Sequence, residues 1–233
     1  MPKEIFKATL TEIRYLTNDI AYFSFDVPAQ FTFTAGQFVL IKITNNGQTK
    51  TKSYSILNPP SEKGKIELCV KIIPGGFASD ILKNARKDEV FEMQGPFGFF
   101  VFDEKKAARN GMENWLICTG AGLAPFYSML TEHVKNNPAI SFTLLFGCRT
   151  RSDILMYSEL KKLAQQCSNF TYLVTLSQEK WNGLQGRVQH HVPAELNNKM
   201  FYLCGFKDMV LETQQLLKSR NVSPENVKIE RYT

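Results

Sequence analysis

A glycine-rich turn between an apolar run and an expected helix is the clearest chemical signal in the chain. Residues 116–126 read Leu-Ile-Cys-Thr-Gly-Ala-Gly-Leu-Ala-Pro-Phe. A buried strand that leads into Gly120-x-Gly122 and then a helix is suited to bind a pyrophosphate, because glycine lets the backbone approach and the helix start offers N–H groups. The third glycine of the usual dinucleotide fingerprint is missing, so this segment alone is a weak signal.

A second segment of this kind lies in the first half of the chain. Gly75-Gly76-Phe77-Ala78-Ser79 opens the one helix expected there, and it would accept another pyrophosphate. Upstream, Lys52-Ser53-Tyr54-Ser55 closes a strand, where Tyr54 offers a ring for stacking and Ser55 a hydroxyl for hydrogen bonding. The first half of the chain therefore offers donors for a second pyrophosphate, a ring for stacking and a hydroxyl for hydrogen bonding.

Two further motifs stand late in the chain, after Gly95-Pro96-Phe97-Gly98. Cys204-Gly205 ends a strand, and Glu230-Arg231-Tyr232 precedes the last residue. Singly, each has an ordinary interpretation: a buried cysteine packs, a carboxylate is solvated and a terminal tyrosine frays. What argues for chemistry is that the weak motifs follow one another in order, each at the boundary of an expected element.

The elements that would position these motifs differ between the two halves. Short alternating strands predict an antiparallel β-barrel over residues 1–103, residues 104–114 are charged and polar and predict a linker, and residues 115–233 alternate strands and helices. That alternation favours a parallel sheet with helices on both faces, a Rossmann-like α/β domain. The expected strands are 5–14, 20–27, 37–44, 51–57, 65–73, 89–94, 115–119, 140–147, 170–176, 200–204 and 226–232, and the expected helices are 78–85, 124–136, 153–166 and 207–219.

Composition excludes several classes of protein. The net charge is +6, but the lysines and arginines are scattered, which disfavours a nucleic-acid-binding protein and fits either a solvated surface or steering toward an acidic protein. The five cysteines have neither CxxC spacing nor the C-x4-C-x2-C loop of an iron–sulfur site, so we expect no metal, cluster or disulfide. No signal peptide or membrane span is recognisable, and we expect a cytoplasmic protein with no membrane partner.

In their order, the motifs resemble the ferredoxin–NADP reductase superfamily, in which an FAD-binding barrel precedes a nicotinamide-binding domain. That family has R-x-Y-S, G-x-x-S, G-P-F-G, G-T-G-x-A-P, C-G-x-x-x-M and a terminal E-x-aromatic. The chain has nearly all of these, including Met209 five residues after Cys204. In length it is most similar to the bacterial members that have no iron–sulfur domain.

The resemblance implies roles for individual residues. Tyr54 would pack on the flavin, and Ser55 would hydrogen-bond near the ring nitrogen that receives the hydride. Cys204 and Glu230 would line the place where nicotinamide meets flavin, and Tyr232 would cover the flavin until nicotinamide displaces it. Ser55, Cys204 and Glu230 are the expected catalytic residues. The expected cofactor-binding residues are Lys52, Tyr54, Ser55, Gly75, Gly76, Ser79, Thr119, Gly120, Gly122, Pro125, Arg149, Arg187 and Tyr232.

The sequence departs from the family pattern where charge matters. Lys52 replaces the arginine that pairs with the flavin phosphate; lysine keeps the charge but lacks the planar fork, so the sequence leaves open how tightly FAD is held. Where NADP-specific bacterial members have Ser-Arg-Glu, this chain has Ser177-Gln178-Glu179. Arg149 and Arg187 favour NADPH, whereas Gln178 and its neighbouring carboxylate favour NADH, and the balance falls slightly toward NADH.

The resemblance predicts an FAD-dependent enzyme that takes a hydride from NAD(P)H and passes electrons to a separate acidic acceptor, a ferredoxin or a flavodoxin. Three alternatives remain open: the reductase component of a multicomponent oxygenase, a free-flavin reductase, and a non-catalytic electron-transfer subunit or binding module.

Overall fold

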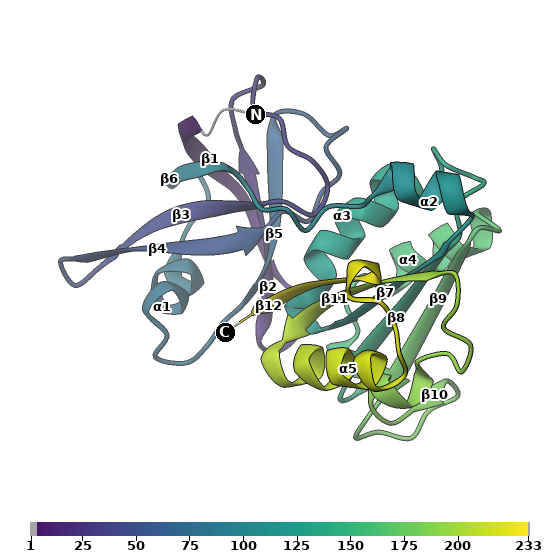
Figure 1. Ribbon diagram of the computed structural model, residues 1–233. Coiled ribbons are helices and arrows are strands. Elements are labelled where there is room, and N and C mark those ends of the chain that lie inside the picture. The colour runs from purple at the N-terminus through teal and green to yellow at the C-terminus, as the bar shows by residue number, and fades with distance from the viewer. Residues whose placement is uncertain (1–3, 233) are drawn as a thin grey trace. The chain divides into compact units, whose positions relative to one another are not determined.

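The computed structural model describes residues 4–232, which form two compact units (Figure 1). Residues up to Val101 together with Ala124–Glu132 make the first unit, and Phe102–Leu123 with the residues from His133 onward make the second. The expected linker at 104–114 contains helix α2 (Glu104–Asn110) and lies within the second unit. Local caps explain this helix: the Asp103 carboxylate accepts the Lys106 N–H at 3.0 Å, and Gly111 takes a left-handed conformation after the last turn.

The first unit is built on a six-stranded antiparallel sheet in the order β4-β3-β6-β1-β2-β5. Its strands are β1 (Glu4–Tyr15), β2 (Ile20–Asp26), β3 (Phe38–Asn45), β4 (Gln48–Ser55), β5 (Lys65–Lys71) and β6 (Val90–Phe97), and its own helix is α1 (Phe77–Asn84). The two edges of the sheet approach each other, because Ile56, directly after β4, pairs with Leu68 of β5. The expected antiparallel fold is therefore confirmed as a curled sheet that is partly closed.

Alternating side chains explain why these strands curl around one core. On β3, Val39, Ile41 and Ile43 are buried, whereas Lys42 and Thr44, on either side of Ile43, are exposed. β1 and β6 bury every second residue over part of their length in the same way, whereas β2 is buried at six successive positions and the first six residues of β4 are exposed.

Most of helix α3 (Leu123–His133) belongs to the first unit, although the chain reaches it from the second. The Ser128 hydroxyl donates to the Asn58 carbonyl at 2.7 Å, and the Phe126 ring lies 5.7 Å from that of Phe100. This assignment contrasts with the sequence expectation, which placed the whole helix in the second domain.

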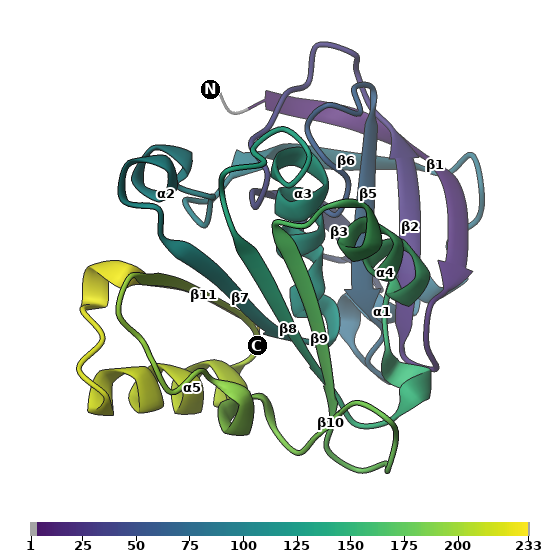
Figure 2. The same ribbon diagram turned by 90° about the vertical axis from the view of Figure 1, so that its right-hand side faces the viewer.

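The second unit has a six-stranded parallel sheet in the order β10-β9-β8-β7-β11-β12. Its strands are β7 (Glu113–Thr119), β8 (Phe142–Cys148), β9 (Phe170–Leu176), β10 (Leu184–Gln185), β11 (Lys199–Phe206) and β12 (Val227–Tyr232), and its other helices are α4 (Tyr157–Gln166) and α5 (Lys207–Ser219). Figure 2 shows α5 on one face of this sheet and α4 on the other. The expected parallel α/β fold is confirmed.

Helix α4 starts four residues later than the sequence predicts. Residues Arg151–Asp153 instead form a short 3-10 turn, which a reciprocal capping box between Thr150 and Asp153 stabilises. Among the described residues, no helix is long and apolar enough to cross a membrane.

Two glycines bring the ends of β7 and β11 into direct backbone contact. A Cβ atom on Gly122 would lie 2.5 Å from the carbonyl oxygen of Cys204, and one on Gly205 would lie 2.6 Å from the Thr119 hydroxyl. Gly205 also has a φ of +140°, which L side chains rarely adopt. Only glycine at both positions permits this approach.

The opposite ends of β7 and β11 are joined by an ion pair. Lys199 is buried, at 8% exposure, and its ammonium lies 2.7 Å from the Glu113 carboxylate; this hydrogen bond lowers the pKa of Glu113. We predict that Glu113→Gln destabilises the protein by about 1 kcal/mol at pH 7, a value kept small because the Glu113 side is exposed.

The pH dependence of this stabilisation follows from the direction of the pKa shift of Glu113. Because the folded-state pKa is lowered, the stabilisation is complete above the ordinary glutamate pKa of about 4.3 and is lost as the pH falls through the lowered value. Denaturant unfolding at several pH values measures the difference in stability between Glu113→Gln and the wild type. Glu92→Gln breaks the pair between Glu92 and Lys42, which is exposed on both sides, and should change stability less. Equal losses in the two variants would contradict the prediction.

The glycine contact predicts a second stability effect. Gly122 has an ordinary φ, so Gly122→Ala acts through the clash with Cys204 alone, and we expect a loss of about 2–3 kcal/mol from overpacking. Gly111→Ala is the control, since Gly111 has a φ of +55° but open space around a Cβ, and strain there costs about 1–2 kcal/mol. Denaturant unfolding followed by tryptophan fluorescence compares them. A Gly122→Ala variant as stable as the wild type would show that the contact is not required.

Candidate functional site

The glycine turn after β7 offers backbone donors at the carboxyl end of the parallel sheet. Thr119 ends β7, Gly120 has a φ of +53°, and residues Gly120–Gly122 form a single 3-10 turn that runs into α3. Pro125 is buried in the first turn of α3, where its missing N–H leaves no intrahelical bond unmade. N–H groups at such a helix start, with no side chain on Gly120 or Gly122 to cover them, are suited to an anion.

Cys204, Glu230 and Tyr232 come together beside this turn. Cys204 is fully buried on β11, with Cys118 of β7 and Glu230 of β12 as its register partners. Burial, followed by the charge of Glu230, raises the pKa of the Cys204 thiol well above its usual value, while a hydrogen bond with the Tyr232 side chain lowers it. The sulfur therefore stays protonated at neutral pH, which excludes it as a thiolate nucleophile.

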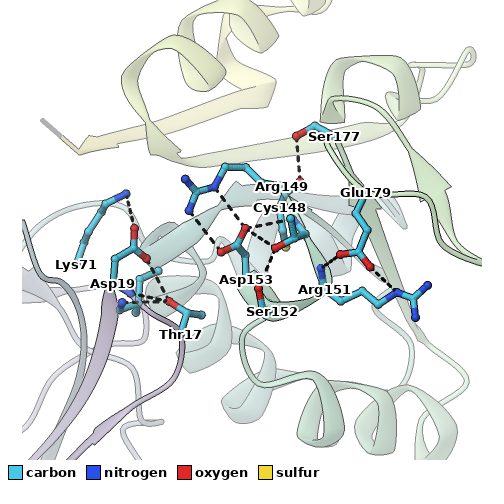
Figure 3. A network of polar contacts seen from close by, with 12 residues as sticks. Thr17, Asp19, Lys71, Cys148, Arg149, Arg151, Ser152, Asp153, Ser177 and Glu179 are labelled. Atoms are coloured by element: carbon cyan, nitrogen blue, oxygen red, sulfur yellow. Dashed lines mark hydrogen bonds and ion pairs between the residues drawn. The ribbon is translucent and has the colours of Figure 1, made fainter.

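The loops after β8 and β9 carry paired charges (Figure 3). The Arg149 guanidinium lies 3.3 Å from the Asp153 carboxylate within one loop. Arg151 reaches across to Glu179, with 3.1 Å between Nε and the carboxylate and 2.8 Å from its backbone N–H. The sequence analysis named Arg149 but missed Arg151, because nothing in a local pattern relates a loop residue to a carboxylate 28 positions later.

The Ser177-Gln178-Glu179 triplet lies where the sequence predicts, directly after β9. The Ser177 hydroxyl and backbone N–H both donate to the Cys148 carbonyl, at 3.2 and 3.0 Å, and the Gln178 N–H donates to the Arg149 carbonyl at 2.9 Å. The loops after β8 and β9 are thus fixed to each other. Arg187 lies beyond β10, and its guanidinium is 3.3 Å from the Glu212 carboxylate of α5.

In the first unit, the start of α1 forms a tight glycine loop. Gly75 has a φ of +70°, and Gly76 caps the helix without a side-chain hydrogen bond to the first turn. A Cβ on Gly76 would lie 2.9 Å from the Ile73 carbonyl. The Ser79 hydroxyl is buried and accepts the Ile73 N–H at 2.9 Å, so it holds the loop together. Its contact with a phosphate stays a prediction.

Strand β4 brings two amines and a tyrosine toward that loop. Lys50, Lys52 and Tyr54 share one face by alternation, and the Lys50 ammonium lies 4.5 Å from the centre of the Phe77 ring at the start of α1. Burial raises the pKa of Tyr54 to about 12, so its phenol stays neutral. Ser55, the last residue of β4, is 6% exposed. The sequence analysis selected Lys52, Tyr54 and Ser55 but missed Lys50.

These donors fit two phosphate-bearing cofactors, one for each unit. The glycine loop at α1 and the lysines of β4 have the charge and open backbone that a flavin dinucleotide phosphate needs, and the half-buried ring of Tyr54 offers a face for stacking. In the second unit, the turn Gly120–Gly122 has the same character for a nicotinamide dinucleotide. Each of the two candidate phosphate sites therefore lies within a single unit.

Known proteins match the chain in both units. Residues 7–102 match the family described as oxidoreductase FAD-binding domain, and residues 116–215 match the oxidoreductase NAD-binding domain. Ferredoxin--NADP reductase B from Sorangium cellulosum is 30% identical over 98% of both chains. The phenol 2-monooxygenase reductase component DmpP of a Pseudomonas species is 25% identical over 99% of this chain and 66% of its own length.

A solved structure has the same fold. The cytochrome P450 reductase GcoB of Amycolatopsis superposes with a TM-score of 0.90 and 25% identity, over all of this chain and 71% of its own. With both domain families matched and a ferredoxin–NADP reductase similar over nearly its whole length, the chain belongs to the ferredoxin–NADP reductase family of FAD- and NAD(P)H-dependent oxidoreductases.

Proposed function

We propose that this enzyme takes a hydride from NADH in preference to NADPH and delivers the electrons to an acidic acceptor protein, a ferredoxin or a flavodoxin. The observation that carries the choice of acceptor is the 98% mutual coverage with ferredoxin--NADP reductase B. The net charge of +6 supports it, because a basic protein attracts an acidic partner over long range and speeds their encounter. The cytoplasmic location stays a prediction.

The second candidate is a reductase component for an oxygenase. The similarity to the phenol 2-monooxygenase reductase component favours it, but that relative is matched over only 66% of its length. A free-flavin reductase and a non-catalytic subunit are the remaining candidates. Retention of Ser55, Cys204 and Glu230 argues against the non-catalytic subunit, and the aromatic Tyr232 near the terminus argues against the free-flavin reductase.

When bound, FAD supplies the chemistry that converts hydride transfer into one- or two-electron delivery. The residues of the first unit then have positioning tasks. The Gly76 N–H donates to the Ile73 carbonyl at 2.9 Å, so the N–H groups in the first turn of α1, with Lys52, would hold the phosphates. The Tyr54 ring would stack on the isoalloxazine. The nearly buried Ser55 hydroxyl would hold the reacting edge of the ring by a hydrogen bond.

The second unit has the complementary task of holding the nicotinamide dinucleotide. Thr119, Gly120 and Gly122 would bind its pyrophosphate through backbone N–H groups. Cys204 would present a small protonated sulfur rather than a charge, since burial keeps its pKa high. Glu230 and Tyr232, next to it, would complete the pocket, with Tyr232 as the residue that nicotinamide displaces.

An anaerobic absorption spectrum tests the proposal first. The purified protein, supplied with FAD, should show a flavin band that bleaches on addition of NADH and recovers on addition of an oxidised acidic ferredoxin or flavodoxin. The rate of recovery should fall as salt is added, because screening weakens the attraction between the charged partners. A protein that binds no flavin would overturn the proposal in favour of a binding module, and recovery with free flavin alone would favour the free-flavin reductase.

Ser55→Ala should slow flavin reduction by NADH about tenfold or more while FAD stays bound, because a hydroxyl that positions the reacting ring is lost. Stopped-flow absorbance under anaerobic conditions measures the rate, and the flavin content of the purified variant measures retention. Ser53→Ala is the matched control, since Ser53 is exposed on the same strand. Unchanged reduction kinetics in Ser55→Ala would remove Ser55 from the mechanism.

Gln178→Arg should raise the ratio of kcat/KM for NADPH to that for NADH about tenfold, because it restores a cation that a 2′-phosphate can use. Steady-state kinetics with both nucleotides give the ratio. Gln166→Arg adds the same charge at the end of α4 and should leave the ratio unchanged. A ratio that does not move in Gln178→Arg would contradict the assignment of this loop to the nucleotide's 2′ position.

A further inference from the structure

One ion pair joins two loops that follow neighbouring strands of the parallel sheet. Glu179 lies after β9 and accepts two hydrogen bonds from Arg151, which follows β8: one from the backbone N–H at 2.8 Å and one from Nε at 3.1 Å. The same guanidinium donates to the Lys180 carbonyl at 3.4 Å. One carboxylate is thus held by both the main chain and the side chain of a single arginine (Figure 3).

The position of this pair makes it relevant to nucleotide choice. Glu179 directly follows Gln178, whose backbone N–H is bonded to the Arg149 carbonyl, so the pair is part of the loop contact at the carboxyl ends of β8 and β9. Ligands of parallel α/β sheets bind at that edge. The NADP-specific pattern Ser-Arg-Glu has the same glutamate as Glu179 but an arginine where this chain has Gln178. Here the nearby cation is Arg151, two residues after Arg149, and Glu179 engages it.

We infer that the Glu179–Arg151 pair disfavours NADPH in this enzyme, because Glu179 balances the charge of Arg151 and so withholds this cation from the 2′-phosphate. The inference rests on the proposed nucleotide site. A 2′-phosphate brings up to two negative charges next to Gln178, where it meets the Glu179 carboxylate and a guanidinium whose charge that carboxylate already balances. A 2′-hydroxyl is neutral and meets no such penalty.

The pair can be opened without disturbing the loop. The Arg151 side chain is 59% exposed, and its guanidinium contacts Glu179 through Nε and the Lys180 carbonyl through NH2, so it can reorient when the carboxylate charge is removed. In Glu179→Gln the amide oxygen still accepts the Arg151 backbone N–H, which keeps the backbone contact between the loops. Arg151→Met then removes the cation but keeps most of the apolar stem.

The experiment measures binding of nucleotide fragments and so does not depend on turnover. Calorimetric titration with 2′-phospho-AMP and with AMP gives the affinity ratio for the wild type, Glu179→Gln, Arg151→Met and the double variant. We expect Glu179→Gln to raise the affinity for 2′-phospho-AMP relative to AMP about tenfold, in line with one charge-assisted hydrogen bond gained. The double variant should return this ratio to the wild-type value. Glu225→Gln removes an equal charge just before β12, at the amino end of that strand, and should leave the ratio unchanged.

Other outcomes of the titrations would each contradict one part of the proposal. If Glu179→Gln does not raise the ratio, the pair does not disfavour NADPH. If the gain persists in the double variant, Arg151 is not the withheld cation. If no variant binds AMP or 2′-phospho-AMP, the nucleotide site itself is wrong and the proposed function falls with it, whereas AMP binding with an unchanged ratio removes only this inference.

Discussion

The direct backbone contact between the ends of β7 and β11 is the constraint on which the second unit depends. Gly122 and Gly205 have no side chains to keep the turn after β7 away from Cys204 and Thr119. Because the two strands are parallel and in register, this contact fixes the glycine turn, Cys204 and, through β12, Glu230 at one edge of the sheet. The arrangement of the glycine turn, Cys204 and Glu230 therefore depends on the close approach of the ends of β7 and β11.

The two units provide for phosphate in different ways. On the first unit, Lys50 and Lys52 lie on the face of β4 that approaches the start of α1, and their amines add charge to the backbone donors there. On the second unit, Arg149, Arg151 and Arg187 each face a carboxylate at 3.1–3.3 Å. On the proposed function, phosphate in the second unit would be held mainly by N–H groups of the glycine turn, because these arginines are already balanced by carboxylates.

Burial rather than acid–base strength sets the chemical character of the site. The phenol of Tyr54 stays neutral and the thiol of Cys204 stays protonated, because desolvation raises the pKa of both groups. Neutral groups around a hydride-transfer partner position rings and exclude water without competing for the transferred charge. In an oxidoreductase of this family the cofactor carries the redox chemistry, and the protein positions the rings and shields them from water.

Local sequence patterns were enough to predict most strands and helices, the antiparallel and parallel sheets and the positions of both glycine turns, but not helix α2 or the short strand β10. These depend on local features such as period-two burial on β3, the helical stripe of α5 and glycine at Gly75 and Gly120. Which charged groups pair depends on contacts between distant segments. The Arg151–Glu179 pair, the approach of Lys50 to Phe77 and the packing of α3 on the first unit join residues that are far apart in the chain. The physical reason is that a local pattern fixes the conformation of a segment, whereas a contact between two loops depends on where the sheet places the ends of their strands.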